Sequence, residues 1–183
     1  MLLVIAGPSG TGKGTVVRRL LEREPRLWFS VSATDRAPRP GEVDGRDYHF
    51  LTHDDFCALR DAGGLLEWFE VYGDLKGTPR APVEEHLAAG DDVLVEVDVQ
   101  GALAIRTEIP DASLVFLRPP SREVQRARLL ERDPGADPID LERRLAAAEA
   151  EEAAAASFDA VVVNDDVEQT VDELLALLEA RRG

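Results

Sequence analysis

The chain has 183 residues, 44% of them hydrophobic, which suits one globular domain with a sizeable core. Its formal net charge of −15 argues against nonspecific binding to DNA, RNA or anionic lipid, because these polyanions would be repelled. No apolar run approaches the ~20 residues of a membrane span, and neither the short apolar N-terminal run nor the single cysteine, Cys57, indicates secretion. We therefore expect a cytoplasmic protein with no nucleic-acid or membrane partner.

Short apolar runs alternate with helical patterns along most of the chain. The runs are rich in leucine and β-branched residues and are bounded by Gly, Pro, Asp or Asn, which predicts buried strands. The predicted strands are residues 2–6, 93–97, 113–117 and 160–163. The predicted helices are about 14–23, 99–107, 121–132, 139–156 and 166–181. This alternation predicts an α/β fold in three layers, with a parallel sheet and helices on both faces.

The segment from about 30 to 92 breaks this alternation. It has turn signals at 37–41, a capping pattern at 52–55 that opens a helix to about 61, and a strand-like run at 65–72. We expect an inserted subdomain there, with short strands over the edge of the sheet. Residues 133–138 contain two prolines and a glycine between two arginine-bearing helices, which suits the tip of a movable lid.

The most informative motif lies between the first predicted strand and helix. It reads Gly7-Pro8-Ser9-Gly10-Thr11-Gly12-Lys13-Gly14-Thr15. In a P-loop of this kind the glycines let backbone N–H groups surround an oligophosphate, at the positive end of a helix dipole. Lys13 adds a cation that can reach the terminal phosphates, so we expect a nucleoside triphosphate ligand. The general pattern has Ser or Thr directly after the lysine, whereas here Gly14 stands there and Thr15 follows. The pattern therefore does not decide which hydroxyl, if any, would reach Mg²⁺.

A second phosphate site is suggested by two arginines around a rigid proline. Arg36 and Arg39 flank Pro38, and Tyr48 follows. Converging guanidinium groups suit bidentate binding of a phosphate, and a tyrosine hydroxyl can add a donor. On residue types alone, however, solvated surface arginines are the default interpretation.

These two motifs occur together with further short segments in a characteristic order. The segments are 66–68, 77–78, 98–101, 119–121 and 163–166. In order and spacing the set resembles the guanylate kinase family from about residue 2 to 178. The resemblance implies transfer of the γ-phosphoryl group of ATP to GMP, with dGMP as a plausible further acceptor, and it implies Mg²⁺. It also implies one domain over 1–183, with a core (about 1–30, 92–120 and 157–183), a GMP-binding insert (about 31–91) and a lid (about 121–156).

The resemblance assigns residues to the acceptor site. The GMP phosphate would be held by Arg36, Arg39 and Tyr48. Guanine would be read by Ser32, Glu67 and Thr78, with Glu96 and Asp98 near the base and the metal. Guanine presents N1–H and N2–H donors that one carboxylate can accept, and its O6 can accept from a hydroxyl, whereas adenine has the opposite polarity.

Two positions depart from the family pattern. Lys76 stands where many members carry a tyrosine that helps to bind the GMP phosphate. Its charge could replace that contact, Tyr72 could shift into the site, or the contact could be lost. Asp35 stands where a threonine is common, and its carboxylate either weakens the site of the neighbouring Arg36 or points away from it.

The catalytic residues implied by the resemblance lie around the phosphates of ATP and of the acceptor. They are Lys13, Arg36, Asp98, Arg128, Arg132 and Arg144, the last three as lid arginines. Thr15 and Asp98 would contact Mg²⁺, directly or through water, although Asp98 could also simply cap the following helix. The ATP-binding residues would be Gly7 to Thr15 together with Asn164, which lies beside adenine or caps a turn.

The implied chemistry is in-line transfer to an already ionised phosphate oxygen, without a general base, while lid closure excludes water. One alternative is a ribose 1,5-bisphosphate kinase, which would not need the three guanine-reading residues. Another is a non-catalytic guanylate-kinase-like module that binds phosphorylated peptides, although such modules usually have eroded P-loops. A P-loop regulator would leave Arg36, Arg39 and Tyr48 unexplained. The sequence leaves open whether the protein is a monomer or a homodimer.

Overall fold

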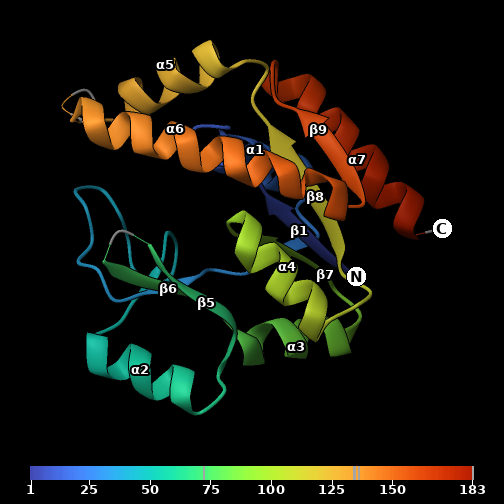
Figure 1. The fold of residues 1–183 in the computed structure, drawn as a ribbon. Coiled ribbons are helices and arrows are strands. Elements are labelled where there is room, and N and C mark those ends of the chain that lie inside the picture. Colours follow the sequence, from blue (N-terminus) through green and yellow to red (C-terminus); the bar gives the residue numbers. More distant parts are fainter. Residues whose placement is uncertain (72, 134, 136, 183) are drawn as a thin grey trace.

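A computed structural model describes residues 1–71, 73–133, 135 and 137–182 (Figure 1). Its strands are β1 (Leu2–Ala6), β2 (Leu27–Phe29), β3 (Ala33–Thr34), β4 (His49–Phe50), β5 (Leu65–Val71), β6 (Asp74–Pro79), β7 (Asp92–Glu96), β8 (Ser113–Arg118) and β9 (Ala160–Val163). Its helices are α1 (Lys13–Arg23), α2 (His53–Asp61), α3 (Arg80–Ala89), α4 (Val99–Glu108), α5 (Arg122–Arg132), α6 (Pro138–Glu152) and α7 (Val167–Arg182), with a 3₁₀ helix at Ala153–Ser157. Among the described residues, none of the helices has the length and apolar character that crossing a membrane requires.

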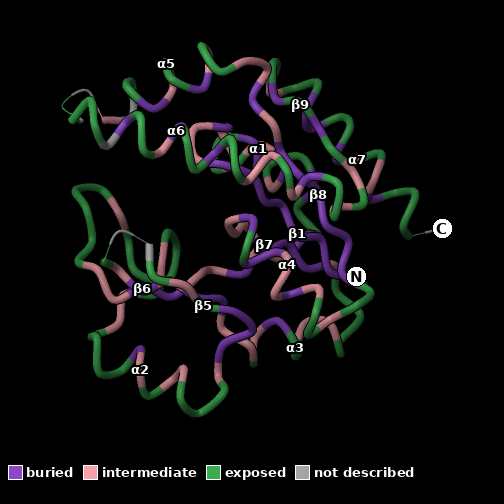
Figure 2. Tube along the Cα trace, viewed as in Figure 1, coloured by how far each residue is buried: buried purple, intermediate pink, exposed green. Residues whose placement is uncertain are grey.

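The central sheet consists of five parallel strands in the order β2-β7-β1-β8-β9. Alternate residues of β1 point to opposite faces, as the strand period of two requires. Leu3 and Ile5 pack with α1 and α7, whereas Leu2, Val4 and Ala6 pack with α3 and α4. Figure 2 shows buried residues concentrated along these central strands. The predicted three-layer α/β fold is confirmed.

A second, four-stranded sheet has the order β4-β3-β6-β5 and is mostly antiparallel. Its small core is centred on Phe56 of α2, which packs with Leu65 and Leu75. The predicted capping pattern is present, since Thr52 Oγ1 accepts the backbone N–H of Asp55 at 3.1 Å. In Figure 1 this sheet lies across a gap from the helix pair α5–α6.

The sequence prediction missed β2 and α3, and it expected short strands in the insert without placing β3, β4 and β6. β2 is only three residues long, which is too short to show a period, and it is recognisable by its pairing with β7. α3 was missed because a proline and two glutamates interrupt its apolar pattern. Although α3 lies within the expected insert of 31–91, its Val83 is buried against the central sheet. The helix predicted for 139–156 ends at Glu152 and continues as the 3₁₀ turn.

Candidate active site

The P-loop connects the central strand to α1 and lies at the carboxyl edge of the parallel sheet. The ammonium group of Lys13 donates to the carbonyl oxygen of Gly7 and, at 3.2 Å, to that of Pro8. The amine therefore lies over the backbone of its own loop. Thr11 is buried, and Thr15 is exposed in the first turn of α1. The strand, loop and helix follow one another as the motif predicts.

Asn164 anchors the P-loop to the connection between β9 and α7. Its side-chain Nδ2 donates to the carbonyl oxygen of Thr11 at 2.7 Å, and its Oδ1 accepts from the Thr170 hydroxyl at 3.2 Å. Asn164 is only 2% exposed. Gly12 has a φ of +87°, and a Cβ there would lie 2.6 Å from Nδ2 of Asn164. The glycine is required both by the backbone conformation and by this close approach, while a contact between Asn164 and adenine stays a prediction.

Helix α5 is attached to the P-loop by two side chains. Gln125 Nε2 donates to the carbonyl oxygen of Ser9 at 2.7 Å. Arg128 donates to the carbonyl oxygens of Thr11 at 3.1 Å and Asn164 at 3.0 Å. Arg128 therefore contacts the P-loop backbone, while its role as a lid arginine over the phosphates stays a prediction.

Helix α6 packs on α5 through Leu129, Leu141 and Leu145. It carries Arg144, which is half-buried. The side chain of Arg132 lies outside the described part of the chain, as do residues 134 and 136 of the predicted lid tip. These parts of the lid prediction therefore stay untested.

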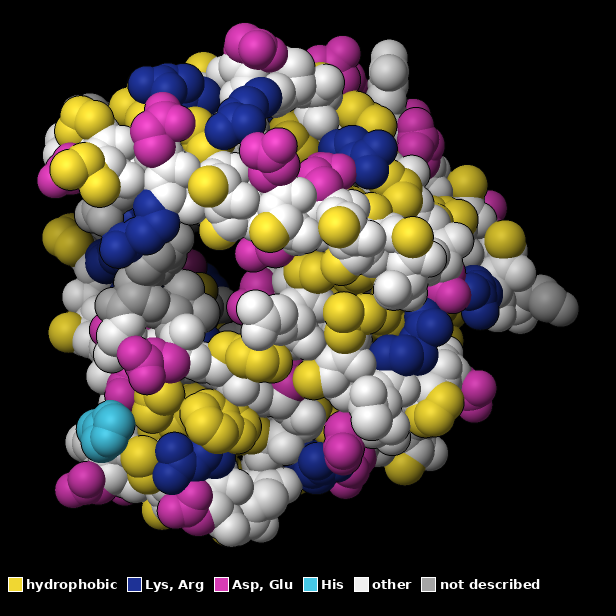
Figure 3. All heavy atoms as spheres, viewed as in Figure 1, with side chains coloured by type: hydrophobic (Ala, Val, Ile, Leu, Met, Phe, Trp, Pro, Cys, Tyr) yellow, Lys and Arg dark blue, Asp and Glu magenta, His cyan; other side chains and the backbone are white. Residues whose placement is uncertain are grey.

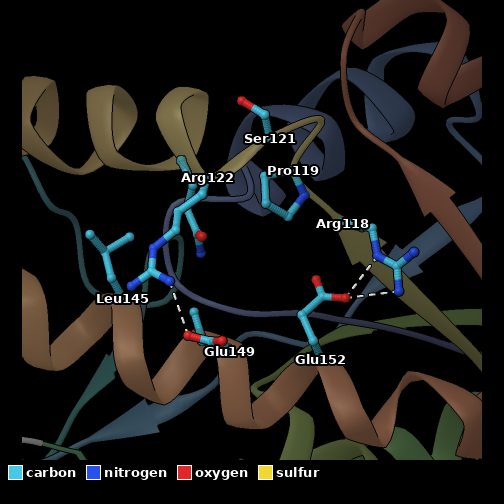
Figure 4. A pocket seen from close by; sticks show the side chains of 9 residues that line it. Arg118, Pro119, Ser121, Arg122, Leu145, Glu149 and Glu152 are labelled. Carbon is cyan, nitrogen blue, oxygen red and sulfur yellow. Dashed lines mark hydrogen bonds and ion pairs between the residues drawn. The ribbon is translucent and has the colours of Figure 1, made fainter.

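A cavity of about 480 Å³ lies where α5 and α6 meet the end of β8. Figure 4 shows Arg122 paired with Glu149 and Arg118 paired with Glu152 beside it. Gln125 also lines it, so the cavity adjoins the P-loop. None of the predicted site residues lines this cavity.

Two acidic side chains lie within electrostatic reach of Lys13. Glu96 ends β7 beside Ile5 of β1, and burial raises its pKa, while the charges of Lys13 and Lys76 lower it. Glu151 of α6 is half-buried, and burial also raises its pKa, opposed by Lys13. The sequence prediction missed Glu151, which stands in an alanine-rich and glutamate-rich helix with no motif of its own.

Asp98 is the N-cap of α4. Its Oδ1 accepts the backbone N–H of Gly101 at 2.7 Å, so the capping interpretation is confirmed. A Cβ on Gly101 would lie 3.2 Å from that oxygen and 3.1 Å from Oε2 of Glu67. The missing side chain of Gly101 thus lets the two carboxyl groups approach each other, and the contact of Asp98 with a metal stays a prediction.

Glu67 and Thr78 form a buried polar pair between β5 and β6. The Thr78 hydroxyl donates to Oε1 of Glu67 at 2.6 Å, and the two residues are partners in the strand register. Burial raises the pKa of Glu67 to about 7, the negative charge of Asp98 adds to this, and the Thr78 hydrogen bond lowers it. Ser32 directly precedes β3 in the same sheet, and its carbonyl oxygen accepts the backbone N–H of His49 at 2.8 Å. Two of the predicted guanine-reading residues therefore lie in one small sheet, and the third, Ser32, directly precedes its strand β3.

Basic and aromatic groups gather beside this sheet. The Arg36 guanidinium carbon lies 5.0 Å from the centroid of the Tyr48 ring, and the Lys76 amine lies 5.5 Å from the same centroid. Arg39 lies on the adjoining exposed turn. Arg36, Tyr48 and Lys76 are thus brought together, whereas residue 72, the other candidate for this site, lies outside the described residues.

Asp35 points away from this cluster. Its Oδ1 accepts the backbone N–H of Leu75 at 2.7 Å, and its Oδ2 lies 2.7 Å from Nδ1 of His53. The hydrogen bond from His53 lowers the pKa of Asp35, although burial opposes this shift. Of the two alternatives for this carboxylate, the structure favours the one that leaves the Arg36 site intact.

Residues 1–181 match the family model described as guanylate kinase. The chain belongs to the guanylate kinase family. A guanylate kinase of Nocardia farcinica is 53% identical over 178 residues, which cover 96% of this chain and 92% of that protein. A guanylate kinase of Rhodococcus jostii is 52% identical over 182 residues, covering 98% and 87% of the two chains.

A solved structure extends the similarity to three dimensions. The crystal structure of a guanylate kinase from Anaplasma phagocytophilum matches with a TM-score of 0.82 at 32% sequence identity. The match covers 99% of this chain and 85% of that one. Figure 3 shows a hollow between the α5–α6 helices and the second sheet, with acidic side chains on its inner wall and basic side chains at its rim. In this member of the guanylate kinase family, a hollow therefore separates α5 and α6 from the second sheet.

Proposed function

We propose that this chain transfers the γ-phosphoryl group of ATP to GMP, giving ADP and GDP, and that dGMP is a further acceptor. The observation that carries the proposal is the buried Glu67–Thr78 pair, in a chain of the guanylate kinase family that retains the P-loop lysine. The similar proteins named guanylate kinase support the same activity. Neither a ribose 1,5-bisphosphate kinase nor a binding module gains support from these similarities.

Guanine would be selected by the polarity of its hydrogen-bonding edge. The Glu67 carboxylate would accept the N1–H and N2–H groups, and the Ser32 hydroxyl would donate to O6, since the single hydroxyl hydrogen of Thr78 is donated to Glu67. Adenine presents an acceptor at N1, which would leave the buried carboxylate without a donor there. An unpaired buried polar group is unfavourable by roughly 1–3 kcal/mol, which is enough to discriminate against AMP.

Phosphoryl transfer would depend on positioning and on electrostatics. The acceptor oxygen of GMP is already ionised, so no general base is needed. Arg36, Arg39 and Tyr48 would hold the acceptor phosphate. Charge on the transferring group would be offset by Lys13, Arg128, Arg132 and Arg144. Closure of the hollow would exclude water, which otherwise competes as the acceptor.

The residues around the P-loop fit a magnesium ion that is bound mainly by phosphate. Mg²⁺ in such sites keeps several waters and needs only one or two protein oxygens. No cluster of three or more carboxylate, imidazole or thiol groups suited to a metal occurs among the described residues, so a cage built from protein alone is not expected. Thr15 and Asp98 would hold the ion, directly or through water. When bound, it would neutralise charge on the β- and γ-phosphates.

We also propose that the protein is cytoplasmic, that its substrates are small molecules, and that it has no nucleic-acid or membrane partner. They rest on the net charge of −15 and on the single cysteine. Monomer and homodimer both remain compatible with it.

The test is ADP release from Mg-ATP by the purified protein, with GMP, AMP, UMP and ribose 1,5-bisphosphate offered separately. We expect turnover with GMP, at roughly 1–100 per second as is typical of kinases. Turnover with the ribose bisphosphate alone would move the assignment to that relative. GMP binding without turnover on any acceptor would instead identify a binding module.

A further inference from the structure

Three of the five N–H donors of the Arg36 guanidinium donate to acceptors among the described residues. Nη1 donates to Oε2 of Glu42 at 2.7 Å and to the carbonyl oxygen of Ala37 at 2.9 Å. Nη2 donates to Oε1 of Glu42 at 2.6 Å. Because a guanidinium has five N–H groups, this leaves the Nε–H and the second hydrogen of Nη2. The two hydrogen bonds from Nη1 and Nη2 to Glu42 form a bidentate contact, so this carboxylate sets the plane of the guanidinium.

The remaining edge of Arg36 has no acceptor in the part of the chain that the structure describes. The Arg36 side chain is only 8% exposed, and its Nε is buried with no hydrogen-bond partner among the described residues. A buried donor without an acceptor is unfavourable. The Nε–H and the free Nη2–H point the same way along one side of the guanidinium, which matches two oxygens of a phosphate.

Glu42 also shapes the turn that carries Arg39. Its Oε2 accepts the backbone N–H of Arg39 at 2.7 Å, while the backbone N–H of Glu42 donates to the carbonyl oxygen of Arg39 at 3.0 Å. One carboxylate therefore contacts Arg36 through its side chain and Arg39 through its backbone. The Arg36 hydrogen bonds lower the pKa of Glu42 to about 2, so the carboxylate stays ionised at neutral pH.

We propose that Glu42 is a positioning residue for the acceptor, which holds Arg36 and the Arg39 turn so that the Nε–Nη2 edge of Arg36 faces the phosphate of the acceptor nucleotide. This inference rests on the proposed function, since it requires a phosphate beside Arg36. Glu42 does not compete with that phosphate, because the two acceptors use different edges of the same guanidinium.

The test compares Glu42→Gln with Asp47→Asn. The glutamine keeps the size of Glu42 but replaces one acceptor oxygen by a donor, which faces an arginine N–H. Asp47→Asn removes the same charge from the same segment, where the carboxylate accepts from the exposed Arg46 and from the backbone N–H of Val43 and does not contact Arg36. The amide oxygen of asparagine can keep the Val43 contact. For Glu42→Gln we expect the KM for GMP to rise about tenfold or more, the loss typical of a charge-assisted contact, with kcat and the KM for ATP changed less than about threefold. Asp47→Asn should leave all three constants unchanged.

Guanosine separates positioning from a general structural defect, since it has the base but no phosphate. Its inhibition constant should be the same in Glu42→Gln and in the unmodified protein. Equal loss of affinity for GMP, guanosine and ATP would overturn the proposal in favour of a structural role. Tighter GMP binding by the variant would also overturn the proposal, because it would show that Glu42 competes with the GMP phosphate for Arg36.

Two further measurements test Glu42 even if Glu42→Gln does not fold or the unmodified protein does not phosphorylate GMP. If Glu42→Gln does not fold, Glu42→Asp keeps the charge but is too short for both contacts, and the same selective rise in the KM for GMP is expected. If the unmodified protein does not phosphorylate GMP, the proposed function fails by itself. Calorimetric binding of GMP and guanosine to both proteins then still tests Glu42, and equal GMP affinity would overturn its role.

Discussion

The Thr78 hydroxyl donates a 2.6 Å hydrogen bond to Oε1 of Glu67, and the two residues are 0% and 9% exposed. This contact partly offsets the burial that raises the pKa of Glu67 to about 7. The pKa of this carboxyl group therefore lies close to neutral pH in the free protein. The protonation of Glu67 can be varied by pH, and its hydrogen-bond partner Thr78 can be varied by substitution, without changing the P-loop.

We expect kcat/KM for GMP to fall as the pH drops below about 7. Burial disfavours the charged form of Glu67, so the proton is bound below this pKa and released above it. Only the ionised form accepts the N1–H and N2–H groups of guanine, which gives a limiting loss of about tenfold per pH unit. The measurement is a pH profile of kcat/KM for GMP, beside one for ATP. In Glu67→Gln this step should vanish, while the second ionisation of the GMP phosphate, near pH 6, should remain.

Thr78→Val should move that step to higher pH. The substitution removes the hydrogen bond that lowers the pKa of Glu67 but keeps the volume of the buried side chain. At pH 7 we expect kcat/KM for GMP to fall about tenfold, the size of one lost hydrogen bond to a charged group. Thr78→Ser, which retains the hydroxyl, is the matched control and should behave like the unmodified protein. An unshifted profile in Thr78→Val would contradict the coupling.

Lys13→Ala should abolish phosphoryl transfer. The amine lies over the P-loop backbone and is the mobile cation of the motif, so its removal should lower kcat by about 10³-fold or more. ADP release measures the loss, and circular dichroism checks the fold. Arg18→Ala, which removes an exposed cation from the same helix, should retain activity. An active Lys13→Ala protein would refute the catalytic assignment.

Asn164→Ala should weaken ATP binding and destabilise the protein together. The buried amide bridges Thr11 and Thr170, and its loss removes both hydrogen bonds, although Arg128 and Asp166 still pair with these two residues. We expect the free energy of unfolding to fall by about 1–3 kcal/mol. We also expect the KM for ATP to rise more than that for GMP. Urea denaturation and steady-state kinetics provide the two readouts. An equal rise of both KM values would show that the anchor does not act through the P-loop.

Lys76→Met should raise the KM for GMP without affecting that for ATP. The Lys76 amine lies beside the Tyr48 ring and close enough to Glu96 to lower its pKa, so it can supply charge to the acceptor phosphate. The loss of one such contact corresponds to about a tenfold change. In Lys76→Tyr, the tyrosine common in the family should largely restore the KM. An unchanged KM for GMP in Lys76→Met would show that the contact is absent.

Local patterns were sufficient for the long elements and for the P-loop. Strands β1, β8 and β9, the capping of α2 by Thr52 and the order of strand, loop and helix around Lys13 all follow from spacing over a few residues. β2 and α3 could not be predicted in this way. A three-residue strand has no readable period, and the amphipathic pattern of α3 is obscured by its proline and glutamates.

The candidate site likewise has some residues that the sequence predicts and others that it does not. Lys13, Arg36, Glu67 and Asp98 could be predicted as site residues from the sequence, because the resemblance to the guanylate kinase family rests on short motifs that contain them. The pairing of Glu42 with Arg36 and the proximity of Glu151 to Lys13 could not be predicted, since an isolated acid looks the same in the sequence whether it is solvated or lies near a cation. The direction of Asp35 was also undecided until its contacts with Leu75 and His53 were known.

The sequence by itself determined the fold class, the family and the chemistry of a phosphate-binding loop, because periodicity and motif spacing are local properties. Only the tertiary structure decided which edge of Arg36 is left open, that Asn164 anchors the P-loop, and that Glu67 is buried beside Thr78. Hydrogen-bond direction and burial depend on residues far apart in the chain. Their pairing is established only when the two sheets and the lid helices pack together.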